Sequence, residues 1–527
     1  MNKLNYKYRN SKLLMSLLVI LFTMMFSSCQ DKLEEAFLNP EKATDVKIEY
    51  LYSSTLMNEL YLWEYGDYFH KFDYFNAFLQ TGGPERDMSF LQQPNSNLGQ
   101  GWFGRYYVNI MKNVNMMNEL YNGMSDEEKA QYDVYMDLAN ITKCYGIGFI
   151  SDLFDDVPYS EAFGAFSNNF FPKYDTQQEV YKAAISELKE IATRLNGMTL
   201  DPDIPVHALL ASQDVFFGGD LDKWSRFASS IRLRMAMRLS EVDPDYAKSE
   251  IADIVSNFDL ITEPEYNAVW IERDANRKND NSRIWRSYKE QRTWGAMSFL
   301  APGYMFYELM QPANDPRIPV LFAPDKNGEY TALDQLPSHP HIDPVDYSAD
   351  IAASYPSQYN WTTFGGNYNL PFLIVTSSEI NFILAEAAQR KWITANAKAY
   401  YDKALQQSID LYYDINANST DVIYNFKPTK PDQTAIDDFI NNSTAAYDGT
   451  IECIIEQKYI HFNMHKPYEI WNDLRRVGYP NIPNKGLCTE TVVRMPYPGS
   501  EETTNFDNFK EVNEKNNYTT KVWWDAN

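Results

Sequence analysis

Apolar residues that recur every three or four positions are the strongest constraint on how this chain folds. This spacing places side chains on one face of an α-helix, and that face leaves water only by packing against other elements. The clearest stretches are 181–195, 224–239, 380–387 and 451–462. Further helices are expected near 106–121, 128–149 and 395–413. The sequence therefore predicts a mostly all-α scaffold of packed helices.

Two of these stretches begin with a capping box. Thr176 is followed three residues later by Glu179, and Thr376 is followed by Glu379 in the same way. In this motif the threonine side chain accepts a hydrogen bond from the third helical amide, while the glutamate accepts one from the amide of the threonine. We therefore expect helices to begin directly after Thr176 and Thr376.

Two regions interrupt the helical pattern. Residues 64–105 are rich in Gly, Asn and aromatic residues, and residues 260–372 contain many Pro, Asp, Asn, Tyr and Trp. We expect irregular loops and short strands there, inserted into a helical-pair scaffold that resembles a tetratricopeptide array, although no strict repeat of about 34 residues is present. The segment 481–527 is also expected to be largely irregular. Recognition residues often lie on loops held by a rigid scaffold.

The amino terminus has the pattern of a bacterial export signal. Residues 1–28 contain four basic residues near the start and then a 14-residue, largely apolar stretch from Leu13 to Phe26. That stretch is shorter than the roughly 20 residues that span a bilayer. Two serines and Cys29 follow, an ending typical of a lipoprotein signal in which the cysteine receives the lipid. The alternative is an ordinary export signal in which Cys29 has no role.

This pattern predicts three parts of the chain: a signal peptide over residues 1–28, a tether over residues 29–40 and a single domain over residues 41–527. A formal net charge of −25 excludes a nucleic-acid partner, since no basic surface would neutralise phosphates. The sequence leaves open the state of three cysteines, Cys144, Cys453 and Cys488.

Each candidate motif for an active site or a bound cofactor lacks a residue or a context that its chemistry needs. The Gly99–Gly104 segment fits GxGxxG, but residues typical of a loop precede it, so we interpret it as coincidence. His461 and His465 lie four apart without the glutamate that a metalloprotease helix needs, and a structural role is expected. The aspartates 152, 155 and 156 are interpreted as a structural turn, with a calcium site as the alternative. We expect no catalytic residue, metal or cofactor.

A series of strings, in this order, resembles the SusD/RagB family. The strings are Asp156–Ala162, Tyr174–Tyr181, Gly218–Asp220 with Trp224, Ile231–Ala236, Thr376–Ile380 with Ala385–Ala387, Glu456–Tyr459, Asp473–Pro480, and Arg494–Pro498 with Glu501 and Asn505. Asp315-Pro316-Arg317 is similar to the group of this family described as starch-binding-associating. Most of these residues are expected to be scaffold, and Arg475 and Arg476 are expected to cap carbonyls or to pair with acids.

The resemblance implies a lipid-anchored, outer-membrane protein of Bacteroidetes, facing the cell surface. Such a protein is non-catalytic, captures an oligosaccharide or less often a peptide, and works with a SusC-like TonB-dependent transporter. The alternatives are a surface glycoside hydrolase, a peptide-binding lid, or a purely structural lid of the transporter. The sequence does not identify the ligand.

Aromatic residues of the irregular regions are the candidates for ligand binding, because rings stack on the apolar faces of sugars. The candidates, with two polar residues that would donate or accept hydrogen bonds, are Trp270, Trp285, Trp294, Tyr359, Trp361, Arg86 and Asn95. Tyr359 and Trp361 would point to one face if their segment is extended. Trp102, Trp224 and Trp471 are instead expected in the core.

The lipid anchor is testable by metabolic labelling with a fatty-acid analogue. We expect label on the wild-type chain and none on Cys29→Ala, since the thiol is the predicted acceptor and several acyl chains hold a protein firmly on a membrane. Equal labelling of both chains would contradict the prediction.

Overall fold

The computed structural model describes residues 46–66, 75–82, 96–164, 169–270, 300–333, 356–367, 369–482 and 492–526. Cys488 therefore lies outside the described residues. From Ile48 onward these residues form one compact unit. The unit is mostly helical, as the sequence predicted, and its described part contains two short strands. None of the described helices combines the length and the apolar character that crossing a membrane requires.

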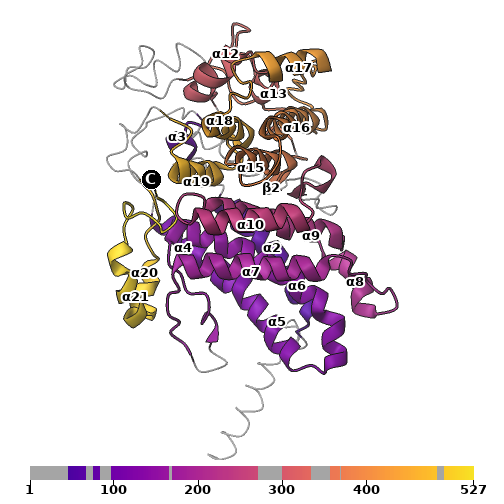
Figure 1. Cartoon of the computed structure of the whole chain (residues 1–527), viewed down its shortest axis with the longest axis vertical. Helices are drawn as coiled ribbons and strands as arrows, with labels where there is room; N and C mark the ends of the chain where they lie inside the picture. The colour runs from indigo at the N-terminus through magenta and orange to yellow at the C-terminus, as the bar shows by residue number, and fades with distance from the viewer. Residues whose placement is uncertain are drawn as a thin grey trace, which may run out of the picture. The chain divides into compact units, whose positions relative to one another are not determined.

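The first half of the unit is built almost entirely of helices (Figure 1). They are α2 (Ile48–Gly66), α3 (Asn76–Phe78), α4 (Ser96–Arg105), the π-helix η3 (Tyr106–Met111), α5 (Lys112–Asn122), α6 (Asp126–Phe154), α7 (Gln177–Leu195), α8 (Pro205–Gln213), α9 (Leu221–Arg238) and α10 (Pro244–Asn257). Helices α6, α7, α9 and α10 pack one against the next, and α2 packs on α5 and α6.

The second half combines short elements with a further helical group. The short elements are the 3₁₀ helix η5 (Pro264–Tyr266), β1 (Ala268–Trp270), the π-helix η6 (Tyr304–Met310), α12 (Gln311–Ala313), α13 (Ile318–Leu321) and β2 (Phe372–Val375). The helices are α15 (Ser377–Gln389), α16 (Ala397–Ala417), α17 (Gln433–Asn442), α18 (Ile451–Phe462), α19 (Pro467–Val477), α20 (Gly499–Thr504), α21 (Phe506–Val512) and the 3₁₀ helix η7 (Asn513–Lys515).

The two strands form a small antiparallel sheet; β1 lies within residues 260–372, where short strands were expected, and β2 begins at the last residue of that region. Ala268 pairs with Val375, and Trp270 pairs with Phe372, with an irregularity after Ala268. Figure 1 shows β2 between the helices α6 to α10 on one side and the helices α15 to α18 on the other. All four residues of β2 are buried, which explains their continuous apolar sequence.

Two predictions about irregular segments are wrong in part. Residues 96–105 form α4, although they contain three glycines and fall in a region predicted to be loop. Trp102 explains the helix, because its buried ring packs edge-on against Phe149 and Tyr468, and such packing outweighs the low helix propensity of glycine. The GxGxxG string lies inside this helix. The carboxyl-terminal segment also contains helices, α20 and α21.

The capping box at Thr176 is confirmed in full, and the one at Thr376 only in half. Glu179 reaches back to the Thr176 amide at 3.0 Å and receives the Thr176 hydroxyl. At the start of α15 the Thr376 hydroxyl accepts from the Glu379 amide at 3.2 Å, but the Glu379 carboxylate turns into the core. It does so because buried cations hold it there.

These cations belong to a central ion network, which we define as Arg234, Arg238, Glu379, Glu386, Lys458, Lys466, Glu469, Asp473 and Arg476. Glu379 pairs with the Arg234 Nε and with the Lys466 Nζ, both at 2.7 Å. Glu469 accepts from the Arg238 guanidinium at 2.6 Å. The network thereby joins α9 to α15 and α19, and all nine side chains are buried.

The second part of the central ion network lies between α15 and α19. Arg476 binds both oxygens of Glu386, at 2.6 and 2.8 Å, and approaches Asp473 at 3.1 Å. Burial alone would raise the pKa of Glu386, but the Arg476 and Arg390 guanidiniums outweigh it and lower the pKa to about 2. Neighbouring cations lower the pKa of Glu379 and of Glu469 in the same way, against the effect of burial.

Removing one partner of a buried pair is therefore expected to destabilise the fold. Arg476→Leu leaves the buried Glu386 without its bidentate partner, and we expect a loss of about 3 to 5 kcal/mol in the free energy of unfolding. Urea denaturation measures it. The matched control is Lys510→Met, which removes an exposed pair with Asp507 and should cost less than about 1 kcal/mol. Equal losses in the two variants would contradict a special role for the buried pair.

The same carboxylates predict a loss of stability in acid. A group whose pKa is lower in the folded state stabilises the fold above its unfolded pKa, and that contribution disappears as the pH falls through the folded value. Glu386 should therefore make its full contribution to the free energy of unfolding above about pH 4.5, and that contribution should disappear as the pH falls toward about 2. We expect the double variant Glu386→Leu/Arg476→Met to lose less stability between pH 6 and pH 3 than the wild type does. An identical pH dependence would contradict this assignment.

Candidate functional site

Five residues of the predicted sites lie outside the described residues. They are Cys29, Arg86, Asn95, Trp285 and Trp294. The structure locates the other three candidates, Trp270, Tyr359 and Trp361. Trp270 ends β1 opposite Phe372 and is partly buried, with its ring packed against the hydrophobic core. Part of its surface stays accessible, so Trp270 stays a predicted binding residue.

Tyr359 is a core residue, and its assignment to an exposed stacking surface is corrected. Its side chain is 3 % exposed, and its hydroxyl donates to the Thr81 carbonyl at 2.5 Å. Its ring centroid lies 4.8 Å from that of Phe322. The prediction assumed that residues 359–361 are extended, but the bridge to Phe322 ends at Tyr359 and residues 361–366 form turns. The two rings therefore do not share a face.

Trp361, like Trp270, is neither fully buried nor fully exposed. Its indole is partly buried and lies across Gly365 and Gly366. A Cβ at Gly365 would come within 2.3 Å of the Trp361 ring, and one at Gly366 would come within 2.8 Å of its Nε1. Only glycine allows this close approach of backbone and ring. The backbone of the turn at Gly365 and Gly366 thus packs against the indole.

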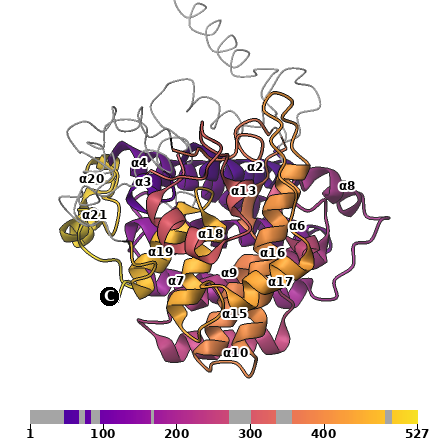
Figure 2. The same ribbon diagram turned by 90° about the horizontal axis from the view of Figure 1, so that it is seen from above.

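Tyr424 completes an aromatic pair with Trp361 and was missed by the sequence analysis. The two ring centroids are 6.0 Å apart at an interplanar angle of 64°, and Tyr424 is 52 % exposed. It lies in the connection between α16 and α17, which extends past the end of α16 in Figure 2. The available signal was a run of three apolar residues, 422–424, between polar residues in a segment without helical periodicity.

Asp421 fixes the conformation of this connection. Its carboxylate accepts hydrogen bonds from the Thr362 hydroxyl at 2.7 Å and from the backbone amides of residues 423, 424 and 425, at 2.9 to 3.3 Å. Burial alone would raise the pKa of Asp421, but these hydrogen bonds lower it, so the carboxylate stays charged. The Trp361 turn and the Tyr424 loop are therefore held together as one surface, the Trp361–Tyr424 face.

The histidine and aspartate motifs are structural, as interpreted from the sequence. His461 is buried, with its two ring nitrogens 2.8 Å from the Thr376 hydroxyl and 3.1 Å from the Ser408 hydroxyl. Asp155 and Asp156 both accept from the Lys515 Nζ, at 2.7 and 2.6 Å. Among the described residues no group of His, Cys, Asp or Glu is arranged to hold a metal ion. Cys144 and Cys453 are buried free thiols.

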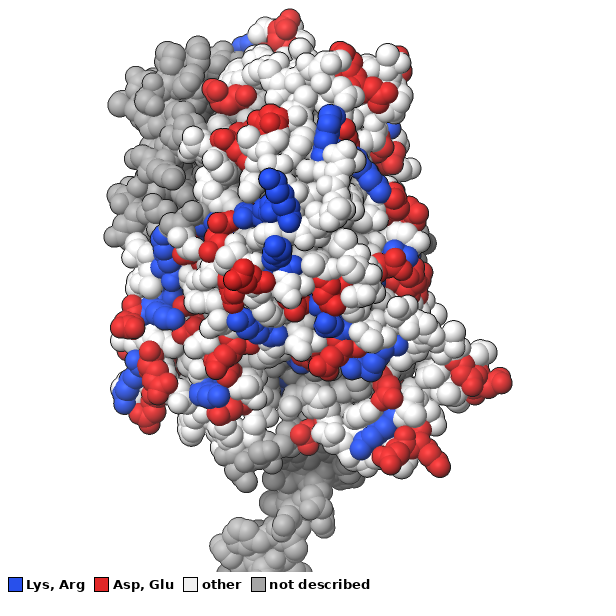
Figure 3. All heavy atoms as spheres, viewed as in Figure 1, with Lys and Arg blue, Asp and Glu red and all other residues white. Residues whose placement is uncertain are grey.

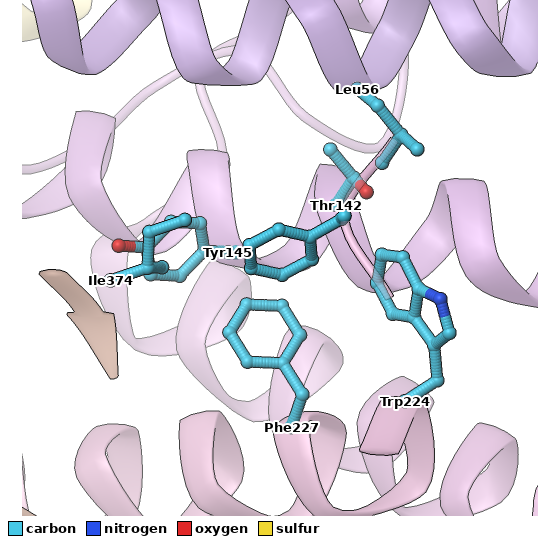
Figure 4. Close-up of a pocket in the computed structure, with 7 residues that line it drawn as sticks. Leu56, Thr142, Tyr145, Trp224, Phe227 and Ile374 are labelled. Carbon is cyan, nitrogen blue, oxygen red and sulfur yellow. The ribbon is translucent and has the colours of Figure 1, made fainter. Parts of the chain in front are cut away.

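Two cavities differ in their capacity to hold a ligand. The first lies beside β2 and is lined by Leu56, Thr142, Tyr145, Phe216, Trp224, Phe227 and Ile374 (Figure 4). Its volume of about 20 Å³ holds one water molecule at most, so it excludes a sugar. The second has about 380 Å³ and lies between the ends of α7, α9 and α10. Its carboxylates Asp222 and Asp259 both pair with Arg226, and Phe258 is the aromatic residue in its lining.

One carboxyl group has the pKa of a general acid. Burial, together with the neighbouring carboxylates Glu452 and Asp448, raises the pKa of Glu456 to about 7. A glycoside hydrolase needs such an acid and a second carboxylate across a cleft. Glu456 lines neither the cavity beside β2 nor the cavity between the ends of α7, α9 and α10.

The surface charge gives no support to an anionic partner. Figure 3 shows acidic and basic side chains interspersed over the viewed face, and the described residues form no continuous basic area on that face. A nucleic acid would need such an area.

Comparison with known proteins decides the family. The family model described as "Starch-binding associating with outer membrane" matches residues 43–498. The chain belongs to the SusD-like family. A search of curated proteins finds no match. Solved structures of SusD homologues have a similar fold, in agreement with this membership.

Three of these structures cover 91 % of this chain. A SusD homologue from Bacteroides fragilis has a TM-score of 0.72 at 22 % identity, with 100 % of its own chain covered. A chitin-binding SusD homologue from Flavobacterium johnsoniae has a TM-score of 0.67 at 23 % identity, with 99 % covered. A structure named as a chitin-binding protein has a TM-score of 0.70 at 23 % identity, with 99 % covered. At these identities the likeness establishes a shared fold.

The strings that resemble the SusD/RagB family act mainly in the scaffold. Arg475 donates to the carbonyls of Asp152 and Val493, at 2.9 and 2.7 Å, and Arg476 pairs with Glu386. The prediction that this arginine pair caps carbonyls and binds acids is thus confirmed. Arg317 of the Asp315-Pro316-Arg317 string is fully buried and pairs with Asp315 at 2.6 Å.

Proposed function

We propose that this chain is a non-catalytic lipoprotein of the outer membrane that binds an oligosaccharide and delivers it to a SusC-like TonB-dependent transporter. The match of the starch-binding, outer-membrane-associating family model to residues 43–498 carries the proposal. The names of two similar structures, which describe chitin-binding proteins, support a glycan as the ligand. The lipid at Cys29 would hold the chain on the membrane, facing the cell surface.

The Trp361–Tyr424 face has the chemistry that a glycan requires. A sugar ring presents C–H groups that pack on an aromatic ring, and its hydroxyls need directional hydrogen bonds. The glycine turn beneath Trp361 and the Asp421 hydrogen bonds hold both rings in place before a ligand arrives. Such preorganisation reduces the entropy lost on binding. Trp270, Trp285, Trp294, Arg86 and Asn95 remain candidates for further contacts in the same proposal.

A transporter partner follows from the need to move the ligand inward. A lipid anchor keeps a protein at the membrane but gives the bound glycan no path across it. The partner in this proposal is therefore an outer-membrane barrel that accepts the glycan. A peptide ligand, or a lid without affinity of its own, is the alternative within the same family.

Glycan binding is tested by calorimetry on the purified soluble chain with a panel of chitin, starch and other oligosaccharides, and with peptides. For the glycan that binds, Trp361→Ala should weaken affinity by about two- to tenfold, since ring stacking contributes about 0.5 to 1.5 kcal/mol beyond area burial. The melting temperature of the variant is measured in parallel. A binding residue loses affinity without a comparable loss of stability.

The matched control is Phe506→Ala, which removes another aromatic ring that is 52 % exposed. It should bind as the wild type does. Equal affinities for Trp361→Ala and the wild type would contradict the assigned face, and binding of peptides alone would contradict the glycan. Release of shorter sugars from a polysaccharide by the purified chain would favour a hydrolase, with Glu456 as the first residue to replace.

A further inference from the structure

A third cavity lies beside the central ion network and is lined by residues of α6, α7, α9 and α19. Its lining includes Gly148, Asp152, Arg234, Arg238 and Glu469. Its volume is about 20 Å³, which is enough for one water molecule, because such a site needs about 10 to 15 Å³. The cavity beside β2 has the same volume. The two cavities therefore differ in the chemistry of their lining and not in their size.

Arg238, which lines this third cavity, has a donor without an acceptor. Its Nη2 donates to Glu469 Oε2 at 2.6 Å, but its buried Nε makes no hydrogen bond to any described residue. Asp152 Oδ2 lies 3.6 Å from this Nε, which is longer than a hydrogen bond. A buried donor without an acceptor costs free energy, so native proteins usually supply one.

Asp152 has the complementary acceptor. Its Oδ1 accepts from the Tyr181 hydroxyl and from Trp524 Nε1, the latter at 2.8 Å. In the described part of the chain its Oδ2 accepts one hydrogen bond, from Asn472 Nδ2 at 3.0 Å. A carboxylate oxygen can accept two, so Oδ2 has room for one more donor. Burial raises the pKa of Asp152, and a further donor would favour its charged form.

A second buried ion pair is separated by the same distance. Arg234 Nη1 and Glu469 Oε1 lie 3.6 Å apart, and both side chains line the cavity. A bridging water can complete a polar contact of this length. Two guanidiniums and two carboxylates in the lining disfavour an ion, because an anion would meet the carboxylates and a cation the guanidiniums. A small neutral molecule that both donates and accepts fits all four groups.

Gly148 supports the same interpretation. It lies inside α6, where glycine lowers helix stability relative to alanine. A Cβ at this position would come 3.5 Å from Met235 Cε, which is an ordinary van der Waals contact, so the neighbouring side chains do not exclude alanine. Both residues line the cavity. The missing side chain therefore leaves space in the cavity.

We propose that this cavity binds one buried water molecule, which accepts a hydrogen bond from Arg238 Nε and donates one to Asp152 Oδ2. Its second hydrogen is available to the Glu469 carboxylate. The water completes the link between Asp152 of α6 and the central ion network. This inference depends neither on the proposed ligand nor on the proposed partner.

The cavity beside β2 is the internal control. Aromatic and aliphatic side chains form most of its lining (Figure 4). Its Thr142 hydroxyl already donates to the Leu138 carbonyl, and Trp224 Nε1 donates to Asp214. Apolar cavities of this kind stay empty of water. We therefore expect water in the cavity beside Arg238 and none in the cavity beside β2.

A crystal structure of the full mature chain, at a resolution that shows ordered water, tests the site. We expect a density peak at about 2.7 to 3.2 Å from both Arg238 Nε and Asp152 Oδ2, and no peak in the cavity beside β2. An empty cavity at Arg238 would overturn the proposal, and so would an ion identified there by anomalous scattering. Water in the cavity beside β2 would overturn the explanation by polar lining.

Gly148→Ala tests the site in solution, where magnetic relaxation dispersion of the solvent counts long-lived buried waters. The variant should hold one such water fewer than the wild type. Its melting temperature should not rise, because the lost bridge offsets the gain in helix propensity. The matched control is Gly104→Ala in α4, where a Cβ meets nothing within 4 Å. It should keep every buried water and melt at a higher temperature.

The two variants separate a bound water from an empty space. A higher melting temperature in both, with the number of buried waters unchanged, would overturn the proposal, since the new methyl group would then only fill a void. If Gly148→Ala does not fold, the density in the wild-type crystal decides between the two.

Discussion

The buried charges between α9, α15 and α19 are the interaction on which the arrangement of this molecule depends. Helix α9 belongs to the first helical group and α15 and α19 to the second, and Arg234, Arg238, Glu379 and Glu469 join them in the core. A buried ion pair contributes little net stability compared with apolar packing. An arrangement that separates its partners leaves unpaired charges buried away from water, which costs several kcal/mol. We therefore expect the network to act on specificity, since its ion pairs form only in one relative position of the two groups.

In a scaffold fixed in this way, the candidate binding residues lie on loops outside the buried core. The side chains of the central ion network are buried and pair with one another, so they are not exposed to a ligand at the surface. The cavity beside β2 is likewise too small for a sugar. The Trp361–Tyr424 face instead stands on turns and on a helix connection, held by Asp421 and by two glycines. Local hydrogen bonds give these loops the rigidity that regular structure supplies elsewhere.

The sequence predicted the helices well because apolar periodicity and capping are local properties. The box at Thr176 and the buried tryptophans 102, 224 and 471 all follow from neighbouring residues. The errors arise where distant contacts decide. Glu379 was assigned to a cap, but Arg234, 145 positions away, binds it in the core. Tyr359 was assigned to the surface, but its hydroxyl reaches Thr81, 278 positions away. No periodicity carries such information, and Tyr424 was missed for the same reason.

The loop between α16 and α17 exposes both aromatic and aliphatic side chains, and the two kinds suit different contacts. Tyr424 is exposed and Trp361 is partly buried, and in the proposed function a sugar stacked on the two rings recovers the free energy that their exposed surface costs. Val422 and Ile423 gain nothing from a sugar, and their burial requires an apolar partner. The Asp421 carboxylate holds residues 423 to 425 in one loop beside Thr362, so the aromatic and the aliphatic side chains of this loop keep fixed positions next to each other.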